Sequence, residues 1–119
     1  MTGLHLILDC RASRFLSNRQ AVEDWLRHTA SQTGMTIIGM QSHLLSSGLD
    51  SGPGVTAIAV IAESHMAVHT WPELGAITAD FYSCRSYDAE QVFHSFCRYF
   101  GVTEVLTHQV FKRYGPESE

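Results

Sequence analysis

Polar side chains able to do chemistry are concentrated in residues 63–73, which read ESHMAVHTWPE. Glu63, Ser64 and His65 follow directly on residues 54–62, which are nearly all apolar and rich in β-branched types. Such a run is typical of a strand that is buried on both faces. Polar groups at the end of a buried strand lie at the rim of a core, where water is scarce and pKa values shift. Residues 63–73 are therefore the candidate reactive segment.

A zinc site is the first chemistry that this segment allows. His65 and His69 are spaced as HxxxH, and Cys84 is a possible third ligand. The β-branched and aromatic residues around His69 favour an extended segment over a helix. Residues four apart on a strand are separated by about 13 Å, which is too far for one metal ion. We therefore expect no metal site here.

Nucleophilic chemistry gives two further possibilities. Ser64 or Cys84, activated by a histidine, would be an ordinary nucleophile. Alternatively, the Ser64 hydroxyl attacks the preceding carbonyl, and elimination and hydrolysis of the resulting ester leave a pyruvoyl group. Self-cleavage of this kind needs a strained X–Ser bond, a hydroxyl and a base, for which Thr56 and His69 are candidates. Residue types and spacing leave both routes open. They also allow an arrangement without chemistry, in which Ser64 and the histidines only form a hydrogen-bonded strand end.

The elements around this segment follow from the pattern of apolar residues. Residues 17–20 form a capping box, and apolar residues then recur at helical spacing until Gly34. Asp88 begins a second helix, which has one apolar face and ends at Gly101. Five strands are predicted, at residues 4–9, 35–43, 54–62, 76–84 and 103–111. The expected order is β-α-β-β-β-α-β, and a chain of 119 residues is expected to form a single domain, 1–119.

Composition narrows the classes of function. Eight Lys and Arg against 12 Asp and Glu give a net charge of −4, which argues against a nucleic-acid partner. No apolar run reaches the roughly 20 residues of a membrane helix, and the N-terminus lacks the basic start of a signal peptide. Three cysteines without a CxxC pair favour a reducing cytoplasm. We expect a cytoplasmic protein that binds neither nucleic acid nor membranes.

The predicted sheet has one face without cover. Two helices cover only one face of a sheet of this size, yet the strand at residues 54–62 is apolar on both faces. An exposed apolar sheet face would be a large adhesive patch. A second copy of the chain is the simplest cover, so we predict a homodimer.

The reactive segment resembles the processing region of the small prokaryotic S-adenosylmethionine decarboxylases, and the similarity extends over nearly the whole chain. Its specific part is the string ESHxxxHTWPE. Matching residues elsewhere are Gly3-x-His5-Leu6 with Asp9, Gly54-Val55, Asp80 and Cys84.

The resemblance implies a self-processing, pyruvoyl-dependent decarboxylase with an α+β fold, a two-layer sandwich with two helices on one face of a mainly antiparallel sheet. The chain would cut itself between Glu63 and Ser64 into a β chain, 1–63, and an α chain, 64–119. Ser64 would become the pyruvoyl group that forms a Schiff base with S-adenosylmethionine, in place of pyridoxal phosphate and without a metal. The decarboxylated product would be the aminopropyl donor of spermidine and polyamine biosynthesis.

The resemblance also implies a role for each matching residue. His69 corresponds to the processing base, and Thr56 to a hydroxyl that assists processing. Cys84 corresponds to the acid that protonates the product, and Glu73 to the ligand of the ribose hydroxyls. In the family the site lies between two protomers. Ser64 and Cys84 would come from one protomer, and Thr56, His69 and Glu73 from its partner. A homodimer or higher homo-oligomer with shared sites is therefore implied.

The substrate region departs from the family pattern. Leu45 stands where an aromatic ring stacks on adenine, Leu74 replaces a tyrosine, and the loop before Thr56 is longer. Asp50 in this loop is a candidate partner for a cationic side chain, which leaves L-ornithine and L-arginine as alternative substrates. Glu73 favours S-adenosylmethionine. A second alternative is a regulatory or binding homologue that does not cleave, which the retained cleavage residues disfavour.

Overall fold

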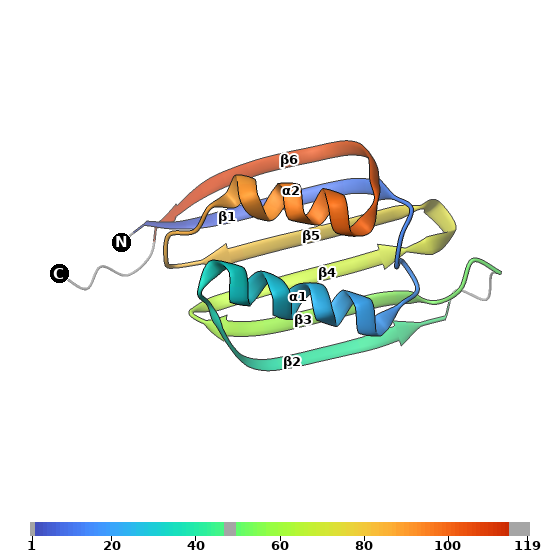
Figure 1. Ribbon diagram of the computed structural model, residues 1–119, viewed down its shortest axis with the longest axis horizontal. Coiled ribbons are helices and arrows are strands. Elements are labelled where there is room, and N and C mark those ends of the chain that lie inside the picture. The colour runs from blue at the N-terminus through green and yellow to red at the C-terminus, as the bar shows by residue number, and fades with distance from the viewer. Residues whose placement is uncertain (1, 47–49, 115–119) are drawn as a thin grey trace.

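The computed structural model describes residues 2–46 and 50–114, so part of the loop that carries Asp50 lies outside the described residues. The described residues form six strands, two helices and one 3-10 turn (Figure 1). The strands are β1 (Thr2–Ala12), β2 (Thr36–Leu45), β3 (Gly54–Ala62), β4 (Ser64–Trp71), β5 (Ala76–Ser83) and β6 (Val102–Tyr114). The helices are α1 (Arg19–Thr33) and α2 (Ala89–Phe100), and the turn η1 (Pro72–Leu74) joins β4 to β5.

The strands pair antiparallel in one sheet, in the order β2-β3-β4-β5-β1-β6. Both helices lie on the same face of this sheet, which confirms the predicted α+β sandwich (Figure 1). The predicted element order was one strand short, because the segment of β4 was expected to be extended but was not counted as a strand. Its apolar Met66 and Val68 are buried, but polar His65 and His69 occupy the alternate positions. That alternation is typical of a half-covered strand.

Local capping sets the ends of both helices. Gly34 and Gly101 end α1 and α2 with φ of 72° and 61°, a left-handed conformation that glycine adopts without strain. Asp88 caps α2 as predicted, since its side chain accepts the Gln91 N–H. The cap of α1 is Asn18 rather than the expected Ser17, because the Asn18 side chain accepts the Ala21 N–H. Neither helix of the described residues is long and apolar enough to span a membrane.

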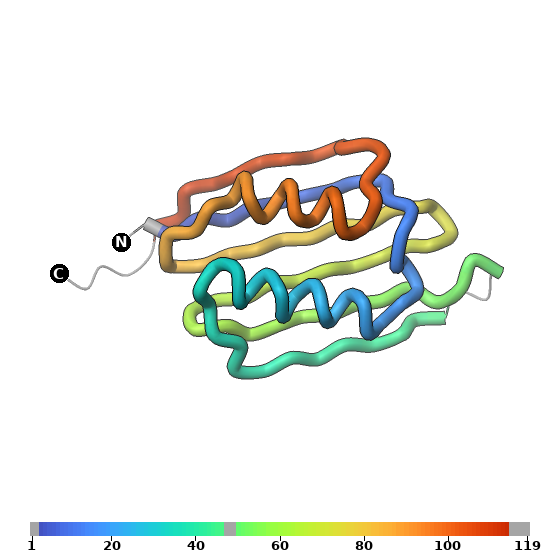
Figure 2. The backbone as a smooth tube through the Cα atoms, in the orientation of Figure 1, coloured from blue at the N-terminus to red at the C-terminus, as the bar shows by residue number. Residues whose placement is uncertain are grey.

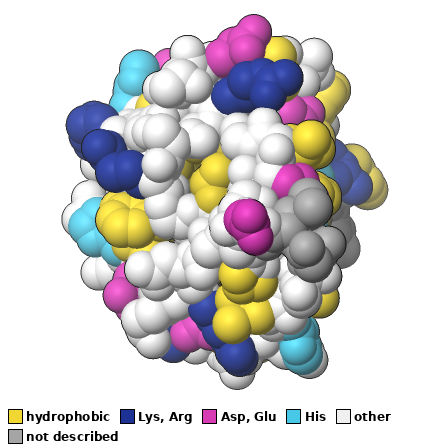
Figure 3. Space-filling view, turned by 90° about the vertical axis from the view of Figure 1, so that its right-hand side faces the viewer, with side chains coloured by type: hydrophobic (Ala, Val, Ile, Leu, Met, Phe, Trp, Pro, Cys, Tyr) yellow, Lys and Arg dark blue, Asp and Glu magenta, His cyan; other side chains and the backbone are white. Residues whose placement is uncertain are grey.

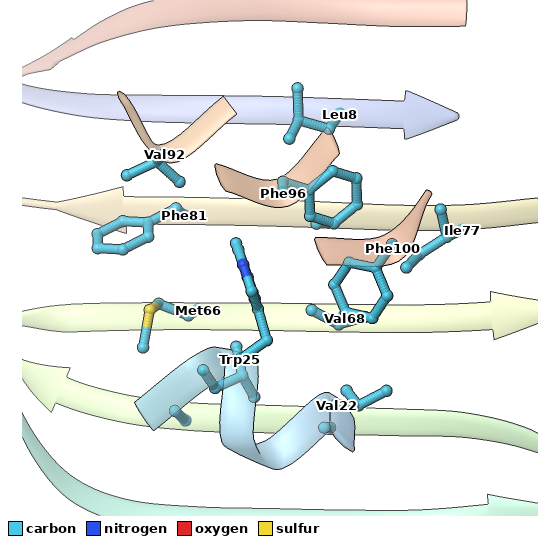
Figure 4. Close-up of a cluster of buried hydrophobic side chains, with 14 of the residues drawn as sticks. Leu8, Val22, Trp25, Met66, Val68, Ile77, Phe81, Val92, Phe96 and Phe100 are labelled. Carbon is cyan, nitrogen blue, oxygen red and sulfur yellow. The ribbon is translucent and has the colours of Figure 1, made fainter. Parts of the chain in front are cut away.

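The core lies between the sheet and the helices. Trp25 of α1 packs against Phe96 and Phe100 of α2, with ring centroids 5.3 and 5.8 Å apart. Figure 4 shows these rings over side chains from the strands, among them Met66 and Phe81. All five side chains are nearly or fully buried. Because these inner side chains are packed in the core, the alternate residues of each strand point away from the helices.

The sheet face turned away from the helices, here called the outer face, carries both apolar and ionisable side chains. Ile58 and Val60 of β3 point to it and are 43% and 47% exposed. The prediction that this strand is apolar on both faces is thus confirmed. Four histidines stand on the same face by strand register, His5, His43, His65 and His69.

The sheet has two ends along the direction of its strands. The β3–β4 turn and the end of β5 lie at one end of the sheet, whereas the β4–β5 turn lies at the other (Figure 2). The first, here called the Ser64 end, holds the start of β4 paired with the end of β5 through Ser64 and Ser83. The second, the His69 end, holds the pairing of Thr56 with His69.

Candidate active site

Ser64 is the first residue of β4 and has an unusual backbone. Its φ is 126°, a region that favours glycine and that other residues adopt at a cost of about 1–3 kcal/mol. The residue is half-buried and is held by ladder pairing to Ile61 of β3 and Ser83 of β5. The hairpin on both sides therefore holds the Glu63–Ser64 link in a strained conformation.

The carbonyl that precedes Ser64 has a backbone donor. The Cys84 N–H donates to the Glu63 oxygen across 3.3 Å. A donor at this oxygen stabilises the negative charge that forms if a nucleophile attacks the carbonyl carbon. The sequence singles out Cys84 for its thiol and not for its backbone N–H. Only the register of β4 and β5 reveals that contact.

Thr56 and His69 lie together, but far from Ser64. Thr56 Oγ1 and His69 Nδ1 are 3.3 Å apart, on adjacent strands β3 and β4. His69 follows Ser64 by five residues on the same strand, a separation of roughly 16 Å at the rise of a β-strand. Within one chain, His69 is therefore out of reach of Ser64 and of Cys84 beside it.

A pocket at the His69 end contains two of the expected substrate-binding residues. Glu73 and Leu45 line it together with Trp71, and its volume is about 210 Å³. Figure 3 looks onto this end of the molecule, where hydrophobic side chains lie among acidic and basic ones. Asp50 is exposed and does not line the pocket. Of the three candidates for substrate binding, two are thus brought together.

A second polar cluster, absent from the sequence interpretation, lies on the outer face towards the Ser64 end. Asp80 Oδ2 lies 2.8 Å from His5 Nε2 and 3.0 Å from His65 Nε2. The Arg113 guanidinium is 2.9 Å from His5 Nδ1. Because arginine only donates, Nδ1 of His5 accepts, and its Nε2 carries the hydrogen given to Asp80. Here this group is called the Asp80 cluster.

The Asp80 cluster has ligand atoms within 4.8 Å of one another, as a metal site requires. Its hydrogen bonds satisfy the same atoms without a metal, since His5 Nε2 is used as a donor. Its residues come from four strands, and His5 of β1 and Arg113 of β6 are distant in sequence from the β4–β5 hairpin. Asp80, His5 and His65 were each visible as family-like residues, but no spacing rule connects them.

The site therefore consists of two separate halves at opposite ends of the sheet. The Ser64 end offers a strained Ser64, a carbonyl with a donor, and the Cys84 thiol. The His69 end offers an imidazole in contact with a hydroxyl, beside a pocket with the Glu73 carboxylate. Acyl transfer within the backbone needs the first half, and proton abstraction needs the second.

Comparison with known proteins gives a consistent family. The profile of the family described as S-adenosylmethionine decarboxylase matches residues 4–113. The S-adenosylmethionine decarboxylase proenzyme of Methanococcus aeolicus is 39% identical over 85 residues, which cover 69% of this chain and 68% of that protein. The proenzyme of Aeropyrum pernix is 35% identical over 85 residues, which cover 69% of this chain and 61% of that protein.

A solved structure shares the fold. The crystal structure of the adenosylmethionine decarboxylase from Aquifex aeolicus VF5 matches with a TM-score of 0.78 over 98% of this chain and 94% of that one. At 23% identity, this likeness concerns the fold. Together with the match over residues 4–113, the relatives show that the chain belongs to the S-adenosylmethionine decarboxylase family.

Proposed function

We propose that this chain is a self-processing, pyruvoyl-dependent decarboxylase that acts on S-adenosylmethionine. The observation that carries the proposal is the Glu63–Ser64 link, where a strained serine follows a carbonyl that accepts the Cys84 N–H. Family membership supports the reaction class. The substrate is supported by the Glu73 carboxylate in a pocket large enough for part of a nucleoside.

Cleavage begins at Ser64. Its hydroxyl oxygen attacks the Glu63 carbonyl carbon, and the carbonyl oxygen takes up negative charge beside the Cys84 N–H. The C–N bond then breaks, the Ser64 nitrogen receives the hydroxyl proton, and Glu63 is left as an ester on Ser64. Release of the φ strain at Ser64 favours this step. A base next removes the Ser64 α-proton, and the ester leaves as the carboxylate of residue 63.

The resulting dehydroalanine tautomerises to an imine, and water replaces its nitrogen as ammonia. A pyruvoyl group then begins the chain 64–119. The residues at this position fit that group, because Ser64 is half-buried at the start of a fixed strand and the Cys84 backbone contacts the residue before it. When present, the pyruvoyl group supplies an electron sink for the carbanion left by CO2. Cys84, whose side chain stands at the same end, is the proposed proton donor.

The base and the nucleophile are proposed to come from different protomers. A same-chain separation of roughly 16 Å along β4 prevents His69 from acting on its own Ser64. A two-fold axis that lies between two facing outer faces and crosses the strands near Ala67, midway along β4, would bring each Ser64 end to the partner's His69 end. The exposed Ile58 and Val60 supply apolar surface for such a homodimer.

Two measurements test the proposal. Intact-mass analysis of the purified protein should show chains 1–63 and 64–119, the second without a free amine, while Ser64→Ala stays whole. Release of labelled CO2 should then be observed from S-adenosylmethionine and be absent in Ser64→Ala. A wild-type chain that stays whole yet decarboxylates would contradict the pyruvoyl mechanism. CO2 from L-ornithine or L-arginine alone would leave the mechanism intact and overturn the substrate.

A further inference from the structure

Tyr82 lies beside the proposed proton donor. It is on β5, two residues before Cys84, and its ring lies on the outer face at the Ser64 end. The Cys84 Sγ is 4.0 Å from the Tyr82 hydroxyl oxygen, with the thiol as donor. The family resemblance assigns no role to Tyr82. Within the described residues, its hydroxyl is nevertheless the side-chain polar group that contacts the Cys84 sulfur.

The Tyr82 ring is held on several sides. Its centroid lies 5.3 Å from that of His5 and 6.0 Å from that of His65. The Arg113 guanidinium lies over the ring, 4.8 Å from its centroid. Such a cation–π contact stabilises the ring position. His5 and His65 each form a hydrogen bond with Asp80. The Asp80 cluster therefore contacts the Tyr82 ring with side chains from β1, β4 and β6.

The Tyr82 hydroxyl keeps its proton at neutral pH. Desolvation and the hydrogen bond from Cys84 raise the pKa of Tyr82 above its ordinary value, although the Arg113 charge opposes the rise. A protonated hydroxyl accepts from a thiol and, after rotation, donates to a thiolate. It can therefore form a hydrogen bond with the Cys84 sulfur both before and after proton transfer.

We propose that Tyr82 is a positioning residue for Cys84, which holds the thiol in place and hydrogen-bonds the thiolate left after protonation of the product carbon. The proposal rests on the proposed function only for the role of Cys84 as acid. The proton leaves Sγ for the substrate carbon, and the negative charge stays on sulfur. The Tyr82 hydroxyl then donates to Sγ without giving up its proton, and a proton from water restores the thiol. Hydrogen bonds to charged groups are about twice as strong as neutral ones, so the hydroxyl favours proton release.

The contact can be measured without cleavage or turnover. In Ser64→Ala, which stays whole, the rate of Cys84 alkylation by iodoacetamide is measured at pH 7 and at pH 10. Only the thiolate reacts, so the ratio of the two rates reports thiolate stabilisation, whereas accessibility alters both rates alike. Peptide mapping assigns the label to Cys84. Burial raises the pKa of Cys10 to about 11 and also raises that of Cys97, so both should react more slowly.

Tyr82→Phe removes the hydroxyl and keeps the ring. In the Ser64→Ala background it should lower the ratio of the pH 7 rate to the pH 10 rate by about three- to ten-fold. Tyr114→Phe is the matched control, because Tyr114 is 87% exposed on β6, and it should leave the ratio unchanged. A ratio that is unchanged or higher in Tyr82→Phe overturns the proposal, whatever the chain does at Ser64.

A second readout concerns the processed enzyme. Tyr82→Phe should cleave as completely as wild type and keep its KM, while kcat falls, because the hydroxyl acts on the thiol and not on substrate binding. Unchanged kcat with a lowered alkylation ratio overturns the role in turnover. A rise in KM with kcat unchanged overturns it as well, because it places Tyr82 in substrate binding. Failure of the wild type to cleave would contradict the proposed function, and the alkylation ratio would still decide the Tyr82–Cys84 contact.

Discussion

Ser64 combines two properties that are separable by substitution, a hydroxyl and a φ of 126°. Ser64→Ala and Ser64→Gly both remove the hydroxyl, so neither should cleave. Glycine adopts this φ freely, whereas alanine keeps the strain. We therefore expect Ser64→Gly to be the more stable variant by about 1 kcal/mol, or roughly 4 °C in melting temperature.

Thermal unfolding followed by circular dichroism measures this difference, and Thr36 provides the control. It is an exposed strand position without positive φ, so the same two substitutions should rank in the opposite order there. Equal stability of Ser64→Gly and Ser64→Ala would show that the backbone at Ser64 is unstrained.

Substitutions of His69 and of Cys84 should impair different stages, chain cleavage for His69 and turnover for Cys84. His69→Ala removes the proposed base and should block formation of chains 1–63 and 64–119. Cys84→Ala removes the thiol but keeps the backbone N–H on the Glu63 carbonyl, so cleavage should continue. Loss of a proton donor should lower kcat by about 10²–10⁴-fold. Intact mass and CO2 release measure the two stages, and a Cys84→Ala enzyme with wild-type kcat would remove Cys84 from the mechanism.

Leu45 supplies apolar surface to the Glu73 pocket but no ring. Leu45→Phe should add stacking on an adenine and lower the KM for S-adenosylmethionine about five-fold or more, by analogy with base–aromatic stacking. Leu44→Phe is the matched control, because the adjacent residue of β2 points to the opposite face. Steady-state kinetics decide the matter, and equal effects of the two substitutions would exclude Leu45 from nucleoside binding.

At the scale of elements, β1 packs closely against the end of β5, at the Ser64 end of the sheet. A Cβ at Gly3 would lie 2.7 Å from the Ser83 carbonyl oxygen and 3.3 Å from the Cys84 Cα. Gly3→Ala should therefore push the strands apart and lower the free energy of unfolding by about 1–3 kcal/mol. Gly39→Ala meets nothing within 4 Å and should change it little. Chemical denaturation measures both, and equal effects would show that the close packing is unimportant.

The ends of the helices were largely predictable from sequence because local chemistry determines them. Gly34, Gly101 and Asp88 act within one turn of their helices, so a single sequence contains the signal. The segment of β4 was expected to be extended but is absent from the predicted element order, although its outer histidines alternate with buried Met66 and Val68.

The contacts of the site were less predictable, because strand order determines them. His5 and Asp80 are 75 residues apart in sequence and meet only because β1 lies beside β5. The Cys84–Glu63 contact depends likewise on the register of the β4–β5 hairpin. Thr56 and His69 were expected to act together, and their contact is present. Their distance from Ser64 follows once residues 64–71 are known to be one strand.

At the scale of the whole molecule, a site shared between two copies of the chain, as proposed, would explain why one face of the sheet lacks cover. The Ser64 end and the His69 end lie at opposite ends of the sheet, separated along β4 by a distance that side chains do not bridge. A two-fold pairing of outer faces would complete two sites at once and bury Ile58 and Val60. Dimerisation would then be a requirement of cleavage as well as of stability.

The central claim is therefore that Glu63–Ser64 cleavage in one chain uses His69 of another. Coexpressed Ser64→Ala and His69→Ala chains, carrying different tags and purified through both, form mixed dimers. One site of such a dimer joins Ser64 of the second variant to His69 of the first, and its other site has neither group. Intact-mass analysis should find a 64–119 fragment that carries Ala at position 69, while each variant alone stays whole. Mixed dimers that stay whole after long incubation would contradict the account.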